Sequence, residues 1–305
     1  MDSYNTERWI SDRNFICQRV QELGGECLIE VAKGSAELQL DQAKTLIDMG
    51  VKVLIVVPVD ITESFKIVDY AAEKNVKVIA YDRVIASEKT DLYLSFDNEK
   101  VGMLQAERAV KAVGKGNYIL LNGPRSDYNA ILYRKGQLEV LRPYMKKGEI
   151  KLIDDIVLNS WTELNAFLAI QELALTHNEQ VNAVLAANDV LANGVISALS
   201  DFEDIGPVYI TGQDAEIQAV QNLINDVQDM TVYKPIKKLA FLAAESAISL
   251  SKNKLPKQAT SIKIAGVNVK TILLEPMVVT KENYMETVIA DNHVSIDQLT
   301  TIKKK

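Results

Sequence analysis

Polar side chains that suit a hydroxyl-rich ligand follow several short apolar segments of this sequence. Asp82 and Arg83 come directly after one such segment, Asn188 follows a second, and Asp214 follows a third. Carboxylates accept hydrogen bonds, guanidinium groups donate them and amides do both, so together they can hold the hydroxyl groups of a sugar. Taken one at a time, Asp and Asn at such places can instead cap helices or form turns, and both interpretations stay open at this point.

Catalysis is the alternative use of these carboxylates. Asp82, Asp189 and Asp214 could act as acid and base, as paired carboxylates do in glycoside hydrolysis. Donor-rich neighbours such as Arg83 and Asn188 favour stable hydrogen bonding over proton transfer. We therefore predict a protein that is not an enzyme, with a glycosidase as the lesser alternative.

Motifs for nucleotide, phosphate and metal binding are missing. Gly114-Lys115-Gly116 has Ile119 where a dinucleotide fingerprint needs its third glycine, and neither a phosphate-binding loop nor a G-x-S-x-G elbow occurs. The two histidines, His177 and His293, lack metal-ligand spacing. A net charge of −7 repels phosphate backbones and disfavours nucleic acid as a partner. We predict no cofactor and no metal.

Apolar runs alternate with helical stretches along most of the chain. Runs rich in Val, Ile and Leu, with little alternation, indicate strands buried on both faces of a parallel sheet. Their alternation with helices of this length indicates a doubly wound α/β fold. The predicted strands are Cys27–Ala32, Val51–Val57, Val76–Ala80, Leu92–Phe96, Tyr118–Leu121, Leu152–Leu158, Ala183–Ala187 and Val208–Thr211. The predicted helices are Glu7–Leu23, Ala36–Met49, Ile61–Lys74, Asn98–Val113, Tyr128–Tyr144, Thr162–Thr176, Asp189–Ser200, Ala215–Ile224 and Pro235–Leu250.

Three further expectations concern the two ends and the cysteines. No strand precedes the helix Glu7–Leu23, although a parallel sheet normally feeds its first helix from a strand, so we expect a strand encoded upstream of Met1. The polar tail Asp291–Lys305 is expected to be frayed. Cys17 lies in a helical pattern and Cys27 in a strand pattern, and both are expected to be buried thiols.

A set of different short motifs is spread along nearly the whole chain, in a characteristic order and spacing. In this combination they resemble the type I periplasmic sugar-binding proteins, closest to the D-xylose-binding proteins of ABC importers. The motifs are Glu7-Arg8-Trp9, Ala80-Tyr81-Asp82-Arg83, Ser95-Phe96-Asp97-Asn98-Glu99-Lys100-Val101-Gly102, Gly116-Asn117-Tyr118, Asn188-Asp189, Gly212-Gln213-Asp214-Ala215 and Met230-Thr231-Val232-Tyr233-Lys234-Pro235.

The resemblance implies two doubly wound parallel-sheet lobes joined by a three-crossing hinge. The N-terminal lobe is expected to hold residues 1–96 plus 236–272, and the C-terminal lobe residues 97–235 plus 273–305. A ligand bridging both lobes would favour a closed state, because only that state makes all the contacts.

The same resemblance implies a pocket for D-xylose. Tryptophan rings can cover the apolar C–H faces of a pyranose, while charged and amide groups bind its rim of hydroxyls. The implied sugar contacts are Arg8, Trp9, Asp82, Arg83, Asn129, Trp161, Asn165, Asn188, Asp214 and Lys234.

The membrane partner has more than one candidate. The resemblance implies an ABC permease that accepts the sugar; the alternative is a sensor histidine kinase of a two-component system that reads the closed state. A sugar-responsive repressor core would need an N-terminal helix-turn-helix, which this chain lacks. No apolar run reaches the roughly 18–20 residues of a membrane span. We expect an extracytoplasmic protein, in the periplasm or at the outer face of the membrane, exported or anchored by a segment absent from this chain.

Overall fold

The chain divides into two compact units. In the computed structural model, residues 1, 7–176, 179–202 and 206–301 are described. One unit comprises Met1–Phe96 with Pro235–Leu274, and the other Asp97–Lys234 with Glu275–Lys305, so the chain passes between the units three times. Among the described residues, no helix has both the length and the apolar character that crossing a membrane requires.

A five-stranded sheet forms the centre of the first unit. Its strands follow the order β1-β2-β3-β10-β9. All neighbours pair in parallel except β9, which pairs antiparallel with β10 at one edge. The inner strand β3 is buried along its whole length, as a strand covered on both faces should be. The bounds are β1 (Val53–Val56), β2 (Lys77–Tyr81), β3 (Leu92–Phe96), β9 (Thr260–Ile264) and β10 (Val267–Leu274).

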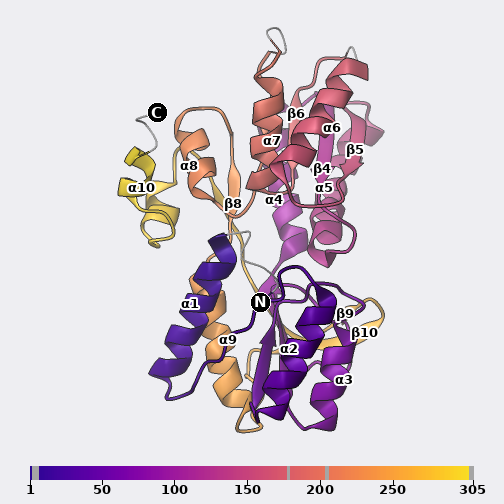
Figure 1. Ribbon diagram of the computed structural model, residues 1–305. Coiled ribbons are helices and arrows are strands. Elements are labelled where there is room, and N and C mark those ends of the chain that lie inside the picture. Colours follow the sequence, from indigo (N-terminus) through magenta and orange to yellow (C-terminus); the bar gives the residue numbers. More distant parts are fainter. Residues whose placement is uncertain (2–6, 177–178, 203–205, 302–305) are drawn as a thin grey trace. The chain divides into compact units, whose positions relative to one another are not determined.

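The helices of this unit bring distant parts of the chain together. Helix α1 (Glu7–Glu22) lies beside α9 (Ile236–Leu250), as Figure 1 shows, and both bury apolar side chains against β2 and β3. Helices α2 (Ala36–Asp48) and α3 (Phe65–Glu73) pack against each other. The Ser35 hydroxyl accepts a hydrogen bond from the backbone nitrogen of Leu38 and fixes the start of α2.

Two of our sequence predictions for this unit were wrong. The segment Cys27–Ala32 is not a strand, because among the described residues no neighbouring strand pairs with it, and Leu28 and Ile29 remain 44% and 43% exposed. The cysteines are not thiols: Cys17 and Cys27 form a disulfide. Gly24, in the left-handed region at a φ of 80°, turns the chain back after α1 and brings the two Cα atoms within 5.4 Å.

The second unit contains a four-stranded parallel sheet of order β5-β4-β6-β7. Consecutive residues of β4 enter different clusters: Ile119 packs with residues of α6 and α7, and Leu120 with residues of α4 and α5. An antiparallel pair, β8 with β11, completes the strands named in this unit. The bounds are β4 (Gly116–Asn122), β5 (Ile150–Val157), β6 (Ala183–Ala186), β7 (Tyr209–Ile210), β8 (Thr231–Tyr233) and β11 (Met277–Val279).

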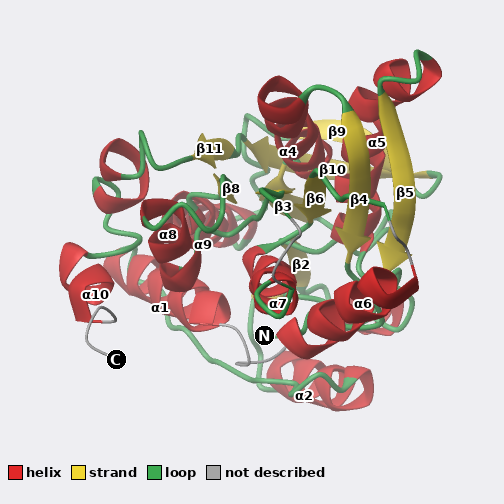
Figure 2. Cartoon of the chain, turned by 90° about the horizontal axis from the view of Figure 1, so that it is seen from above, coloured by secondary structure: helices red, strands yellow, loops and turns green. Residues whose placement is uncertain are grey.

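Helices cover this sheet and extend to the carboxyl-terminal region. Figure 2 shows α6 beside α7, a pair with extensive contact. Our prediction of a frayed tail was wrong for the residues described, because α10 packs on α8 and buries Leu299. Residues 302–305 of the predicted tail lie outside the described residues. The bounds are α4 (Asn98–Val113), α5 (Tyr128–Lys146), α6 (Glu163–Thr176), α7 (Asp189–Leu199), α8 (Ile217–Ile224), the π-helix η1 (Met285–Ile289) and α10 (Ile296–Thr301).

Two glycines allow α4 and α5 to approach closely. A Cβ atom on Gly102 of α4 would lie 1.9 Å from the carbonyl oxygen of Tyr133, and one on Gly136 of α5 would lie 2.0 Å from that of Glu99. Neither position tolerates a side chain unless the helices separate. The contact therefore fixes where α5 presents Tyr133.

Removing the disulfide should weaken the first unit. A cross-link over a separation of 10 residues restricts the unfolded chain, so Cys17→Ser with Cys27→Ser should lower the free energy of unfolding by about 2–3 kcal/mol. Urea denaturation followed by circular dichroism measures this loss. Dithiothreitol should reproduce the loss in the parent and leave the double variant unaffected; equal sensitivity of both proteins would contradict the assignment.

Closing the space between α4 and α5 should destabilise the second unit. Gly102→Ala adds a methyl group against the Tyr133 carbonyl and should cost about 1–3 kcal/mol, although alanine favours helices elsewhere. Lys111→Ala, at an exposed position of the same helix, is the control and should change stability by less than about 0.5 kcal/mol. A Gly102→Ala protein as stable as this control would show that the helices separate freely.

Candidate functional site

A buried cluster of charges lies at the carboxyl end of β2 in the first unit. The Arg8 guanidinium donates to an Asp82 carboxylate oxygen, and its Nε lies 3.4 Å from an oxygen of Asp12, one helical turn along α1. Asp82 adopts the left-handed conformation, with a φ of 62°, and its carbonyl oxygen accepts from Tyr93 and Ser95 hydroxyls at 3.1 and 2.7 Å. The side chains of β3 therefore hold Asp82 in the position that meets Arg8.

Asp12 is a member of this cluster that our sequence analysis missed. It is fully buried and accepts a hydrogen bond from the hydroxyl of Tyr81. Burial raises the pKa of Tyr81 well above its ordinary value, and the adjacent carboxylate of Asp12 raises it further, so the phenol remains a donor. The spacing of four residues between Arg8 and Asp12 on one helix was a usable signal.

Trp9 and Arg83 complete the group of predicted residues in this unit. The guanidinium carbons of Arg8 and Arg83 lie 4.7 and 5.8 Å from the centroid of the Trp9 ring, within the range of cation–π attraction. Arg83 also donates to the carbonyl oxygen of Pro58 at 3.1 Å. Trp9 is only 6% exposed and belongs to the apolar core beneath α1 and α9. Arg8, Trp9, Asp82 and Arg83 thus lie close together.

The second unit contains its own buried charge pair. Lys234, at the end of β8, is almost completely buried, and its Nζ lies 3.1 Å from an Asp214 carboxylate oxygen. Asp214 has a φ of 97°, and its backbone nitrogen donates to the carbonyl of Val232 at 2.9 Å. The Tyr133 hydroxyl lies 3.5 Å from the same ammonium, which also lies 5.9 Å from the centre of that ring. Asp214 and Tyr133 together compensate a cation that water does not reach.

Trp161 extends this group toward the start of α5. Its indole nitrogen donates to Asp127 at 3.2 Å, and its ring forms an edge-to-face pair with that of Tyr133 at a centroid distance of 6.4 Å. Gly123 makes the approach possible, because a Cβ atom there would lie 2.3 Å from the indole. Tyr133 and Asp127 escaped our sequence analysis because neither directly follows an apolar run.

The three predicted asparagines hydrogen-bond within the same unit. Asn129 accepts from the Asn98 side chain at 2.9 Å, and Asn165 donates to the Ser160 hydroxyl at 2.7 Å. Asn188 caps α7, accepting from the backbone nitrogen of Leu191 at 3.0 Å. The capping interpretation therefore holds for the carbonyl of Asn188, and the amide NH₂ is the group of this side chain suited to donate to a ligand.

Asp189, a candidate acid or base in the glycosidase alternative, has a structural environment. It is fully buried, and its two oxygens accept from the Thr231 hydroxyl, the Gln228 amide and the backbone nitrogen of Glu216 at 2.8 to 3.0 Å. Burial raises the pKa of its carboxyl well above the ordinary value, and the nearby Glu216 adds to the rise. These contacts tie the start of α7 to β8 and α8.

Replacing Asp214 should expose the cost of burying Lys234. Asp214→Asn leaves the ammonium without its carboxylate and should lower the free energy of unfolding by about 3–5 kcal/mol. Asp214→Asn combined with Lys234→Met removes both charges and should recover part of that loss. Chemical denaturation of the four proteins of this cycle measures the coupling. If the losses of unfolding free energy in the two single variants add up to the loss in the double variant, the ion pair does not stabilise this part of the protein.

Comparison with known proteins gives consistent results over nearly the whole chain. Residues 1–255 match the family described as periplasmic binding protein domain. The chain is 41% identical over 292 residues to the D-xylose-binding periplasmic protein of Escherichia coli (strain K12), across 95% of this chain and 88% of that protein. The protein of the same name from Haemophilus influenzae gives the same identity and coverage.

A solved structure matches the fold closely. The carbohydrate transporter solute-binding protein of Chloroflexus aurantiacus, in complex with D-glucose, superimposes with a TM-score of 0.92. The match covers 97% of this chain and 96% of that one, at 27% sequence identity.

Proposed function

Because this chain belongs to the periplasmic binding protein domain family, we propose that it binds D-xylose outside the cytoplasm and delivers it to an ABC importer. The observation that carries this proposal is the 41% identity to two D-xylose-binding periplasmic proteins over 95% of the chain. The name of the Chloroflexus relative, a carbohydrate transporter solute-binding protein, supports an importer as the membrane partner. Nothing in the described residues favours a sensor histidine kinase as the membrane partner.

The chemistry of the two charged clusters suits a neutral pyranose. Asp82 and Asp214 can accept from sugar hydroxyls, Arg83, Lys234 and the Asn188 amide can donate to them, and all are held by protein contacts. Such preorganised groups lose little side-chain freedom on binding. The remaining proposed contacts are Arg8, Trp9, Asn129, Trp161 and Asn165.

The sugar is proposed to engage the clusters of both units at once. A ligand shifts a conformational equilibrium only by its differential affinity for the two states. If xylose contacts Asp82 of one unit and Asp214 of the other, the bound form favours the arrangement in which both contacts exist. An importer can then distinguish loaded from empty protein by that arrangement.

We propose that xylose leaves the protein unchanged. Both oxygens of Asp189 are engaged by donors, and Asp82 and Asp214 are each paired with a cation. Contacts of this kind favour stable hydrogen bonding over proton transfer. The proposed role is therefore binding and release.

Titration calorimetry tests the ligand. We expect the tightest binding for D-xylose among xylose, ribose, arabinose, glucose and galactose, and no product on chromatography after prolonged incubation. Arg83→Ala should weaken xylose binding by about 2–5 kcal/mol, or roughly 30- to several-thousand-fold, because Arg83 is proposed to donate to the sugar. Arg142→Ala, at an exposed position of α5, is the matched control and should bind normally. Tighter binding of ribose or galactose, or equal affinities in both arginine variants, would refute the proposal.

A further inference from the structure

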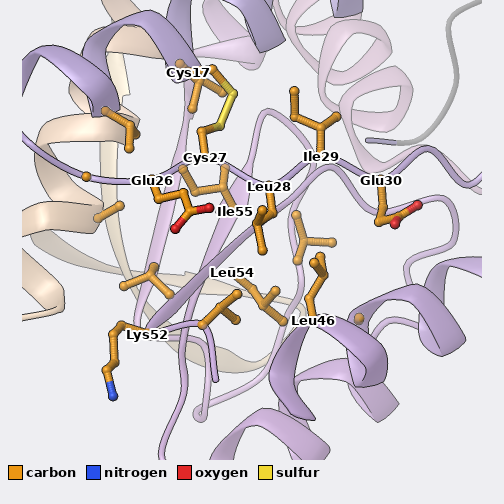
Figure 3. Close-up of a pocket in the computed structure, with 18 of the residues that line it drawn as sticks. Cys17, Glu26, Cys27, Leu28, Ile29, Glu30, Leu46, Lys52, Leu54 and Ile55 are labelled. Carbon is orange, nitrogen blue, oxygen red and sulfur yellow. A yellow bond between two sulfur atoms is a disulfide. The ribbon is translucent and has the colours of Figure 1, made fainter. Parts of the chain in front are cut away.

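The turn between β7 and α8, which carries Asp214, has no covalent support. In the first unit the Cys17–Cys27 disulfide, seen in Figure 3, fastens α1, the helix of Arg8. The chain has two cysteines, and both are used there. The turn of the second unit therefore depends on noncovalent contacts. It needs them, because Asp214 and Ala215 have φ values of 97° and 53°, a region that L side chains rarely adopt.

His293 supports this turn from the carboxyl-terminal part of the chain. Its Nε2 lies 3.1 Å from the carbonyl oxygen of Asp214 and 3.1 Å from that of Ala215. A carbonyl oxygen only accepts hydrogen bonds, so this arrangement requires a hydrogen on Nε2, which donates to both carbonyls. Both carbonyls belong to the residues of positive φ. The imidazole therefore stabilises the turn in the conformation that these residues would otherwise avoid.

The same segment also contacts Tyr233, the residue before Lys234. The centroids of the His293 and Tyr233 rings lie 4.7 Å apart, at an interplanar angle of 45°. The Tyr233 hydroxyl donates to a carboxylate oxygen of Asp291 at 2.7 Å. Burial raises the pKa of Tyr233 well above its ordinary value, and the bond to Asp291 adds to the rise, so the phenol remains a donor. Asp291 and His293 thus contact both chain segments of the Asp214–Lys234 pair.

The backbone between η1 and α10 holds this segment in place. Asn292 has a φ of 54°, which Asn tolerates better than most residues. The backbone nitrogen of His293 donates to the carbonyl of Val288 in η1 at 2.9 Å. Val294 is buried in the apolar cluster that also contains Ala215 of the turn. The imidazole is therefore presented by a fixed backbone and can act as a support.

We propose that His293 is a positioning residue for sugar binding: its Nε2–H holds the turn at Asp214 and Ala215, and so aims the Asp214 carboxylate at Lys234 and at a sugar hydroxyl. This inference rests on the proposed binding of D-xylose. His293 acts through the turn and not by contact with the sugar. Without its donor the turn relaxes in the empty protein, and binding has to restore the turn, so the loss appears as weaker binding.

Three substitutions separate the hydrogen bond from the bulk of the ring. His293→Leu removes the donor and should weaken xylose binding in titration calorimetry by about 5- to 30-fold. Glutamine carries an amide nitrogen as many bonds from Cα as Nε2, so His293→Gln should bind within about threefold of the parent. Asparagine is one bond shorter, and His293→Asn should bind as weakly as His293→Leu. Equal affinities in the Leu and Gln variants would overturn the proposal.

Gln221→Leu is the matched control for a loss of stability. Gln221 is buried in α8, and its side chain donates to the backbone carbonyl of Leu299, in the same tail, at 2.7 Å. Its substitution removes a bond from side chain to backbone in this part of the unit and leaves the donor to the turn in place. Xylose affinity should fall in His293→Leu and stay at the parent value in Gln221→Leu. An equal loss of affinity in the control would show that His293 has only a general structural role.

Hydrogen exchange in the protein without sugar tests the turn itself. The backbone amides of Asp214 and Ala215 donate to groups of β8. Both amides should exchange at least about tenfold faster in His293→Leu than in Gln221→Leu. Equal exchange in these two variants, with xylose binding by the parent intact, would overturn the positioning role alone. A parent protein that does not bind xylose would overturn the proposed function, and with it the effect of His293 on affinity.

Discussion

A charge can be removed from water only when an opposite charge or several hydrogen-bond donors accompany it. Each unit meets this condition at the carboxyl end of a strand, with Arg8 and Asp82 in one and Lys234 and Asp214 in the other. Both aspartates have positive φ, a conformation that Asp tolerates better than most residues. The sharp turn that follows the strand therefore aims the carboxylate back toward its cation, and the surrounding sheet and helices serve to keep that geometry.

A second buried network positions the helices behind the Lys234 cluster. The side chain of Gln137 donates to Gln105, accepts from Asn122, and so joins α5 to α4 and to the end of β4. Gln105 in turn donates to the carbonyl of Ala186 in β6. With the glycine contact between α4 and α5, these bonds leave α5 little freedom to rotate. Tyr133, one turn before Gln137, is held against Lys234 as a result.

Elements whose structure depends on the local sequence pattern were predicted correctly. Predictions failed where the structure depends on a partner distant in the sequence. Strand β3, Leu92–Phe96, was predicted with its observed bounds, because its mostly apolar run reflects burial of every one of its residues. Cys27–Ala32 is also mostly apolar, yet a strand exists only where another strand pairs with it, and none does so among the described residues. Asp82 stands at a strand end and was visible from the sequence, and the position of Asp12 four residues after Arg8 was a local signal too. Tyr133 takes part only because folding brings it to Lys234. The disulfide was missed for a related reason, since its formation depends on the chain reversal after α1.

Because of the disulfide, the stability of the first unit depends on whether its surroundings are reducing or oxidising. Thiol-reducing compartments keep such bonds open, and oxidising ones close them. A chain still inside the cell would lack the link between α1 and the segment after it, and its first unit would open more readily. The bond would close where the surroundings are oxidising and would then hold α1 to the segment that follows it.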